Sequence, residues 1–445
     1  MFKNSIGVKV PEILLPRDGV SMEKWAVVAC DQYTSQPEYW EQVENTVGDA
    51  PSTLRLMLPE MYLDKPDEAE RIAAINAAME RYVADGTLES KGEGFVVVRR
   101  TVGGNTRTGL IVALDLEQYD YNKGSETLIR ASEGTIVERI PPRLRIRAGA
   151  TLELPHILVL IDDPERTVIE PLAADESAQE KLYDFELMAQ GGHIEGYMVK
   201  DGKKIEGALR ALEALADPAA FEAKYGKGKA PMLFAMGDGN HSFATAKANW
   251  ENLKKTLSPA ERENHPARYA LVELENIHDE GIIFEPIHRV LFNVDKEKAL
   301  RWLVERFARD NAGAKLNRFE TWEECDSYAK ICASCGGHFL PFVNEDGFGF
   351  IKVNGPASPL EAATLQTTLD AFLKEFPEVT IDYIHGADVV RELGSKPGNL
   401  GFLLPPMAKD AFFATVVMDG ALPRKTFSMG EANEKRYYLE CRKIK

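Results

Sequence analysis

Short apolar runs and stretches of helical periodicity alternate along the first part of the chain. An apolar run bounded by turn residues is typical of a buried strand, whereas apolar residues three and four positions apart are typical of a helix face. Asp67, followed by Glu70 three residues later, predicts the start of one helix, and Gly86 predicts its end. We expect strands over 27–29, 95–102, 110–114, 157–161, 269–275 and 282–291, and helices from 37 onward and over 68–85, 176–190 and 203–216.

A second series of helix-like and strand-like stretches begins near residue 295. The pattern predicts helices over 297–309, 320–332, 358–375 and 386–394, and strands near 338–343, 348–353, 379–384 and 400–404. Before this point, Asp279-Glu280-Gly281 predicts a hairpin-like turn between two strands. We therefore expect a mixed α+β fold with two domains, residues 1–294 and residues 295–445.

Composition narrows the functional class. The chain has 445 residues, of which 44% are hydrophobic and 28% charged, and a net charge of −17, so its overall field repels nucleic acid and acidic membrane surfaces. It shows neither a signal peptide nor an apolar run long enough to cross a bilayer. The five cysteines do not suggest a disulfide scaffold. We expect a cytoplasmic protein that acts on a small molecule, with no nucleic acid and no membrane as partner.

The most informative segment is residues 231–250. The apolar run Met232 to Met236 ends at Gly237, and a helical pattern begins at Ser242. A glycine turn between a strand and a helix directs backbone N–H groups at one point, where phosphate binds readily. Asp-Gly and Gly-Asn are also ordinary turn formers, and Ser242 is an acceptable helix cap. Asp238 and His241, which flank Gly239-Asn240, favour the functional interpretation.

Three further clusters have a functional and a structural interpretation. His288 and Arg289 lie on a predicted strand and point to opposite faces, which also fits a packed histidine and an arginine in a salt bridge. Residues 130–135 place Glu133 and Thr135 near several arginines, as a solvated charged face would. Cys325, Cys332, Cys335 and His338 could bind zinc, but their spacing matches no common zinc module and buried free cysteines are favoured.

On these residues the chain resembles the bacterial and archaeal proteins classed as domain-of-unknown-function family 1015. That family has an Asp-Gly-His-His-Arg loop before a helix, a Pro-x-His-Arg strand further on and a His-Glu-x-Thr element upstream. The corresponding segments here are 238–242, 286–289 and 132–135, and further landmarks are 29–33, 382–386 and 423–426.

Three positions depart from the family pattern. Asn240 and Ser132 each stand where the family has a histidine, and Ser242 stands where it has an arginine. Losing that arginine removes a bidentate phosphate donor. The Asp-Gly-x-His loop also resembles the active loop of ParB-like and sulfiredoxin-like folds, a group that includes free serine kinases. Sulfiredoxin chemistry is excluded because no cysteine lies between Cys30 and Cys325.

The resemblance implies a ParB/sulfiredoxin-like first domain, with insertions, and a nucleotide or phosphate site. Our leading hypothesis is a small-molecule phosphotransferase with ATP or ADP as co-substrate, kinase-like and acting on serine or a similar hydroxyl compound. A phosphomonoester hydrolase and a non-catalytic nucleotide- or metabolite-binding regulator are the alternatives. Asp238 would hold Mg²⁺, and Glu133 or Asp31 would be the general base. The catalytic set is His241, Asp238, Glu133 and Asp31, and the phosphate-binding set is Gly239, Asn240, Ser242, Thr135, Arg143, His288, Arg289 and Lys425.

Overall fold

The computed structural model describes residues 5–122, 124–175, 179–333 and 336–445. The chain forms two compact units: a first unit of Met1–Ile283, Phe413–Ala421 and Met429–Lys445, and a second unit of Phe284–Phe412 and Leu422–Ser428. The sequence places a boundary between 294 and 295 and assigns everything after it to one domain. The last residues instead belong to the first unit because they pair with its strands: β22 (Tyr437–Tyr438) with β3 (Val27–Val28), and β23 (Arg442–Lys443) with β9 (Leu152–Glu153).

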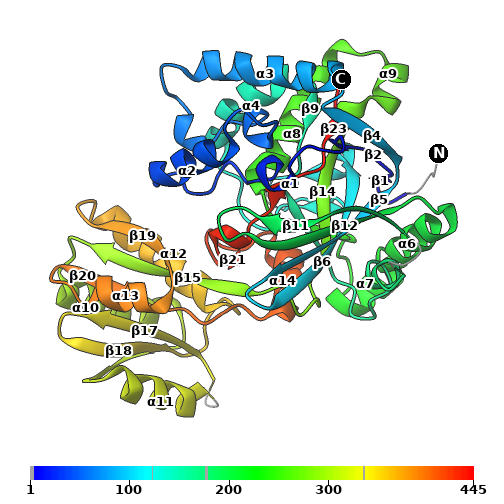
Figure 1. The fold of residues 1–445 in the computed structure, drawn as a ribbon. Coiled ribbons are helices and arrows are strands. Elements are labelled where there is room, and N and C mark those ends of the chain that lie inside the picture. Colours follow the sequence, from blue (N-terminus) through cyan, green and yellow to red (C-terminus); the bar gives the residue numbers. More distant parts are fainter. Residues whose placement is uncertain (1–4, 123, 176–178, 334–335) are drawn as a thin grey trace. The chain divides into compact units, whose positions relative to one another are not determined.

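A mixed sheet of ten strands, counted over the described residues, lies at the centre of the first unit (Figure 1). The strand order is β11-β12-β5-β6-β14-β10-β13-β8-β7, and β1 pairs with β6. Strand β10 runs parallel to β14 and antiparallel to β13. The bounds are β1 Val8–Lys9, β5 Phe95–Val102, β6 Asn105–Asp115, β7 Tyr119–Asp120, β8 Ile129–Arg130, β10 Leu158–Ile161, β11 Glu180–Leu187, β12 Gly192–Val199, β13 Phe234–Asp238 and β14 Tyr269–Asn276.

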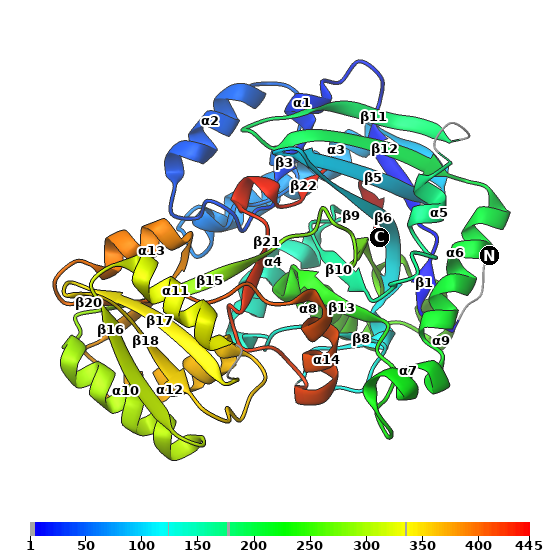
Figure 2. The ribbon, with the colours of Figure 1, turned by 90° about the horizontal axis from the view of Figure 1, so that it is seen from below.

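Continuous apolar runs form the middle of this sheet. Residues 95–98 of β5 and 110–114 of β6 are at most 1% exposed, which explains why their sequence does not alternate between apolar and polar. A small antiparallel pair, β2 (Glu12–Pro16) and β4 (Leu88–Glu93), lies outside the sheet. Helix α4 (Ile140–Gly149) packs on α8 (Asn240–Leu253), as Figure 2 shows. The other helices are α1 Met22–Trp25, α2 Pro37–Val47, α3 Glu68–Ala84, α5 Glu170–Ala173, α6 Gly202–Leu215, α7 Pro218–Tyr225 and α9 Pro259–Asn264, with α14 Lys409–Asp419 spanning the division between the units.

The second unit has a sheet of seven strands among the described residues, in the order β16-β18-β17-β20-β15-β19, with β21 on β15. Leu291 and Phe342 join one apolar cluster and their neighbours Val290 and Val343 another, so both faces of the sheet are covered. The elements are β15 Phe284–Phe292, α10 Lys296–Asp310, β16 Ala314–Phe319, α11 Trp322–Ala333, β17 His338–Asn344, β18 Gly347–Val353, α12 Glu361–Glu375, β19 Thr380–His385, α13 Ala387–Gly394, β20 Asn399–Phe402 and β21 Phe427–Met429.

The mixed α/β class and most predicted elements are confirmed, with three differences. The helix expected over 176–190 is wrong, because Glu180–Leu187 form strand β11, paired along its length with β12. The residues at Asp279-Glu280-Gly281 do not join a hairpin, since β14 and β15 belong to different sheets. Asp67 is the N-cap of α3, but its side chain accepts a hydrogen bond from Arg71 Nε (2.7 Å) and does not cap the helix.

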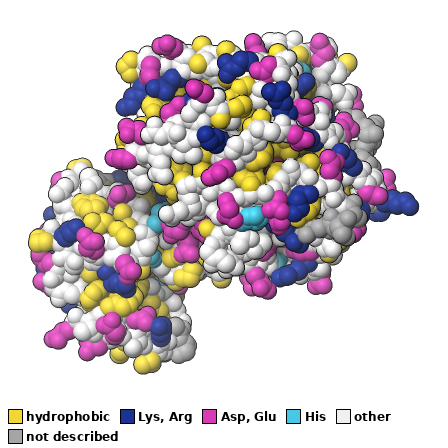
Figure 3. All heavy atoms as spheres, viewed as in Figure 1, with side chains coloured by type: hydrophobic (Ala, Val, Ile, Leu, Met, Phe, Trp, Pro, Cys, Tyr) yellow, Lys and Arg dark blue, Asp and Glu magenta, His cyan; other side chains and the backbone are white. Residues whose placement is uncertain are grey.

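Acidic and basic side chains are interspersed over the face of the first unit seen in Figure 3. Within the part of the chain that the structure describes, no helix combines the length and apolar character needed to span a membrane.

Candidate functional site

Strand β13 leads into helix α8 through a turn that requires glycine. Gly239 is the N-cap of α8 and has a left-handed backbone, with φ +81°. A Cβ atom there would lie 3.1 Å from Ile157 Cα. The register of the sheet explains this closeness, because Leu158 at the start of β10 lies opposite Asp238 at the end of β13. Since glycine has no side chain with which to cap the helix, the N-terminal end of α8 keeps its positive potential.

Asp238 is paired with a lysine from the C-terminal segment. Lys435 Nζ lies 3.0 Å from Asp238 Oδ2 and donates a further hydrogen bond to the Met429 carbonyl (3.1 Å). The other Asp238 oxygen, Oδ1, accepts the Gly239 N–H (2.8 Å). Burial acts to raise the pKa of Asp238, but the Lys435 ammonium and the Gly239 N–H hold it below its usual range. Asp238 is therefore an anion whose charge positions the ammonium of Lys435 at the loop.

The loop is joined to residues 132–136. The Ser132 N–H donates to Asn240 Oδ1 (3.2 Å), and Asn240 Nδ2 donates to Ser132 Oγ (3.3 Å). The next residue, His241, accepts the Ile136 N–H at Nε2 (3.3 Å). Residues 132–136 and the loop at 238–242, which lie about a hundred residues apart in sequence, are thus held together by hydrogen bonds. Glu133, next to Ser132, and Thr135 are both half-buried.

Ser242 begins a chain of hydrogen bonds through the site. Its hydroxyl lies 2.7 Å from His156 Nε2, and His156 Nδ1 lies 3.0 Å from the Tyr438 hydroxyl. Tyr438 in turn accepts the Cys30 N–H (3.3 Å). Its position follows from the pairing of β22 with β3, which ends just before Cys30. Ser242 and His156 are half-buried, whereas Tyr438 is buried.

A second acidic and basic group lies beside this chain. Asp31 follows Cys30 and accepts a hydrogen bond from Gln32 Nε2 (3.0 Å). Arg143 on α4 forms an ion pair with Glu60 (2.5 Å), so part of its charge is already compensated. Burial raises the pKa of Glu60, Arg143 and His156 act to lower it, and Asp31 acts to raise it. These electrostatic effects place Asp31, Glu60, Arg143 and His156 in one neighbourhood.

Three predicted phosphate-binding residues, His288, Arg289 and Lys425, belong to the second unit. Arg289 is fully buried and donates to Gln366 Oε1 (3.1 Å), to the Lys425 carbonyl (2.9 Å) and to the Ile287 carbonyl. His288 accepts the Leu404 N–H at Nδ1 (3.0 Å), and burial together with Arg289 and His385 lowers its pKa to about 4. The bond of His288 matches the packed histidine of the structural interpretation, whereas Arg289 donates to an amide oxygen and to backbone carbonyls where that interpretation has a salt bridge.

The sequence offers two candidate metal sites, a magnesium ion at Asp238 and a zinc ion at the cluster that includes Cys325 and His338. The residues at Asp238 do not fit a magnesium ion held by the protein, since Lys435 and the Gly239 N–H already engage both carboxylate oxygens. For the predicted zinc cluster, Cys325 is buried and His338 Nδ1 lies 3.0 Å from the Thr364 hydroxyl. The Cys332 side chain and Cys335 lie outside the described residues.

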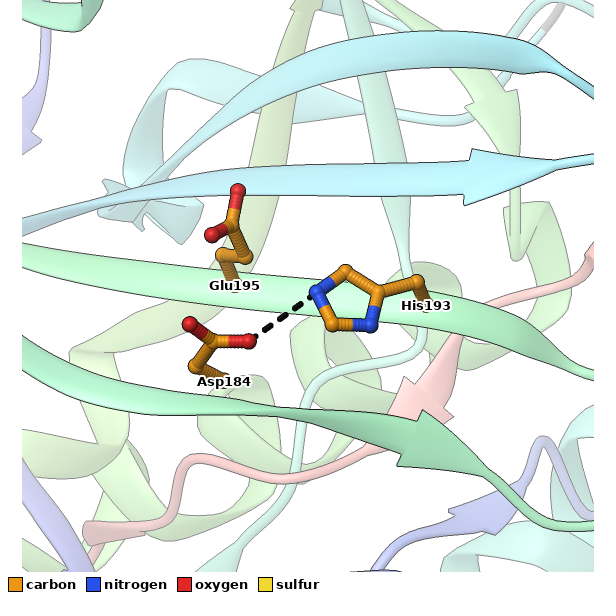
Figure 4. Close-up of side chains that lie close together, drawn as sticks. All are labelled: Asp184, His193 and Glu195. Atoms are coloured by element: carbon orange, nitrogen blue, oxygen red, sulfur yellow. Dashed lines mark ion pairs between the residues drawn. The ribbon is translucent and has the colours of Figure 1, made fainter.

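Asp184, His193 and Glu195 on the β11–β12 hairpin are grouped closely enough to hold a metal ion (Figure 4). His193 Nε2 lies 3.0 Å from Asp184 Oδ1. Lys181 Nζ, however, lies 2.5 Å from Asp184 and 3.6 Å from Glu195. The ammonium of Lys181 therefore already balances the charge of Asp184 and Glu195 where a metal ion would bind.

Sequence reasoning missed His156, Lys435 and Tyr438. None of them belongs to a motif. His156 precedes a predicted strand, which gave a weak indication that it lies at a sheet edge. Nothing in the sequence near Lys435 or Tyr438 indicates that the C-terminal segment returns to the first unit, where β22 pairs with β3 and Arg436 forms an ion pair with Glu273.

Comparison with known proteins identifies a family. The family model described as "Protein of unknown function (DUF1015)" matches residues 14–372, which include the β13–α8 loop and His156 but not Lys435 or Tyr438. No curated protein matches the sequence.

Several solved structures are similar at low identity. A conserved hypothetical protein from Pyrococcus furiosus is 12% identical, with a TM-score of 0.35, covering 74% of this chain and 90% of its own. A free serine kinase in complex with AMP is 12% identical, with a TM-score of 0.38, covering 75% and 92%. SbnI from Staphylococcus aureus, with a C-terminal truncation, is 9% identical, with a TM-score of 0.33, covering 74% and 82%.

Proposed function

The chain belongs to the DUF1015 family, and we propose that it is a small-molecule phosphotransferase. It moves a phosphoryl group from a nucleotide, ATP or ADP, or from another phosphate donor to a small hydroxyl compound such as serine. One observation carries this proposal: the Lys435 ammonium is held 3.0 Å from Asp238 at the glycine-capped start of α8. A cation and a helix N-terminus converging on one loop favour a phosphate ligand.

Phosphoryl transfer depends on positioning and on stabilising charge, and the site provides both. In this proposal Lys435 takes the place of the arginine of the family pattern, where this chain has Ser242. The Ser132–Asn240 bonds and the contact of His241 with the Ile136 N–H hold the loop in one conformation. In this proposal the loop N–H groups and Lys435 bind the transferring phosphate.

The general base is the second element of the proposal. Glu133 and Asp31 are half-buried carboxylates, and we assign the proton of the acceptor hydroxyl to one of them. Arg143 is paired with Glu60 and is assigned a structural role. We assign no step to a magnesium ion on Asp238, and any Mg²⁺ required would enter with the nucleotide phosphates.

The experiment is a phosphorus NMR assay of the purified protein with L-serine and, in separate samples, ATP, ADP or pyrophosphate. Lys435→Met and His241→Ala are the test variants, and Lys443→Met, an exposed lysine on β23, is the matched control. We expect a new phosphomonoester signal with one donor, strongly reduced in Lys435→Met and retained in Lys443→Met. Release of inorganic phosphate alone would indicate a hydrolase. Binding of a nucleotide without turnover would replace the proposal with a regulatory protein.

A further inference from the structure

Ser242 lies in an arrangement that activates a hydroxyl as a nucleophile. Its Oγ is 2.7 Å from His156 Nε2, and the other ring nitrogen, Nδ1, is 3.0 Å from the Tyr438 hydroxyl. Covalent catalysis by serine generally requires a base that takes the hydroxyl proton and a third group that orients this base. We propose that Ser242 is a catalytic nucleophile, with His156 as its general base and Tyr438 as the residue that positions the base.

The role proposed for Tyr438 is to set which nitrogen of the His156 imidazole is free to accept a proton. The phenol accepts the Cys30 N–H (3.3 Å). Burial is the main cause that raises the pKa of Tyr438 well above its usual value, so the phenol keeps its proton. In the proposed arrangement the remaining phenol lone pair accepts the Nδ1–H of His156. The lone pair on Nε2 then faces the Ser242 hydroxyl.

The position of Ser242 in its helix supports the same role. Ser242 is the third residue of α8, whose N-cap is Gly239. Negative charge that develops on Oγ is stabilised by the N-terminal end of the helix. Both Ser242 and His156 are half-buried, so a substrate can reach them. His156 also contributes to the electrostatics of Asp238, which places the pair beside the proposed phosphate site.

The proposed step rests on the proposed function for its substrate, a nucleotide phosphoanhydride. Ser242 Oγ forms a bond to the terminal phosphorus while its proton passes to His156 Nε2. The bond from phosphorus to the bridging oxygen breaks, and this oxygen leaves on the nucleotide with the electron pair and takes the proton from His156. In the second step the acceptor hydroxyl attacks the phosphoserine and gives its proton to His156, which in this double displacement takes the role that a direct transfer would give to Glu133 or Asp31. The bond from phosphorus to Ser242 Oγ breaks, and Oγ takes that proton back from His156 as it leaves. The transfer is therefore a double displacement.

A fluorophosphonate probe tests the nucleophile without relying on the proposed function. The probe forms an Oγ–P bond and releases fluoride, and intact-mass and peptide mass spectrometry locate the adduct. We expect labelling at Ser242, loss of it in Ser242→Ala, and a rate about 100-fold or more lower in His156→Gln. Ser258→Ala, which removes an exposed serine at the N-cap of α9, is the matched control and should label normally. Far-UV circular dichroism of each variant verifies folding, and His156→Asn serves as the second variant.

The positioning role of Tyr438 is tested by a measurement that a merely structural role would leave unchanged. The ¹⁵N NMR shifts of His156 report which ring nitrogen carries the proton, and we expect Nδ1 in the wild type and a shift towards Nε2 in Tyr438→Phe. A His156 tautomer unchanged in Tyr438→Phe would overturn the positioning role.

Separate outcomes distinguish the two proposals. Absence of labelling at Ser242, or labelling unaffected in both His156 variants, overturns the nucleophile even if phosphoryl transfer is observed. Labelling at Ser242 with no phosphate transferred from any donor keeps the activated serine and overturns the proposed function. Phosphoserine at position 242 after incubation with the donor supports both.

Discussion

Ser132 and Asn240, 108 positions apart in the chain, hold each other through two hydrogen bonds, one from the Ser132 N–H (3.2 Å) and one from Asn240 Nδ2 (3.3 Å). Both residues stand where the family pattern has histidine. The two departures therefore lie in contact and form a polar pair of their own. This pair fixes the loop that carries Asp238 and Gly239 against residues 132–136.

The Ser132–Asn240 pair should be energetically coupled. We expect the single variants Ser132→Ala and Asn240→Ala and the double variant to give a coupling free energy of about 1 kcal/mol. Ser132→Ala removes the hydroxyl that accepts from Asn240 Nδ2, and Asn240→Ala leaves the buried Ser132 without either bond to this partner. Urea unfolding followed by circular dichroism measures it. Strictly additive effects on the free energy of unfolding would show that the pair does not join the two segments.

Gly239→Ala should cost both stability and anion binding. The substitution forces a left-handed backbone on alanine, at about 1–3 kcal/mol, and adds a Cβ 3.1 Å from Ile157 Cα. Gly104 has φ +87° and no atom within 4 Å of an added Cβ, so Gly104→Ala is the control for backbone strain alone. Thermal unfolding and titration with pyrophosphate compare the two. Equal pyrophosphate affinities in both variants would contradict a role for the loop in binding.

His288 should make the second unit less stable in acid. Burial is the main cause that lowers its pKa to about 4, below the value of 6.5 for the unfolded chain. The unfolded state therefore binds a proton first as the pH falls, and the stabilisation present above pH 6.5 is lost between pH 6.5 and 4, by about 3 kcal/mol in all. His288→Asn keeps an acceptor for the Leu404 N–H and removes the titration. Its unfolding free energy should lack this dependence, and a parallel pH profile would contradict the prediction.

Glu275 should make the first unit less stable as the pH rises, the opposite of the effect of His288. It is fully buried, and burial is the main cause that raises its pKa to about 8, although Arg107 Nε lies 2.9 Å away. The folded state then binds the proton more tightly than the unfolded state, so stability present below pH 4.5 is lost as the pH rises towards 8. Glu275→Gln should flatten this part of the stability profile. A wild-type stability that rises from pH 5 to 8 relative to Glu275→Gln would show that the carboxyl is ionised throughout.

Local pattern predicted the elements well where propensity and tertiary structure agree. Helices α10 and α12 have apolar faces that pack in the second unit, and their expected ranges are close to those observed. The segment Glu180–Leu187 is the exception. It is rich in residues with good helix propensity, but pairing with β12 and packing of the Tyr183 ring over Gly196 make it a strand. Such pairing joins residues across a turn that no helical periodicity reveals.

The site could be predicted only in part, for a related reason. The loop of Asp238, Gly239 and Asn240 was visible because glycine and polar residues interrupt an apolar run. Lys435 and Tyr438 carry no such signal, since they lie about two hundred residues later and reach the loop through pairing of a two-residue strand. Conversely, His288 and Arg289 have the residue types of a phosphate site, but their burial and internal hydrogen bonds assign them to packing.

The central claim is that phosphate binds at the start of α8 beside Lys435. The most direct measurement is a crystal structure of the protein soaked in tungstate, a heavy-atom analogue of phosphate, at millimolar concentration. We predict an anomalous peak within hydrogen-bond distance of Lys435 Nζ and of the backbone N–H groups that begin α8, and its loss in Lys435→Met. A peak at another location with this loop empty, or no peak at all, would contradict the account.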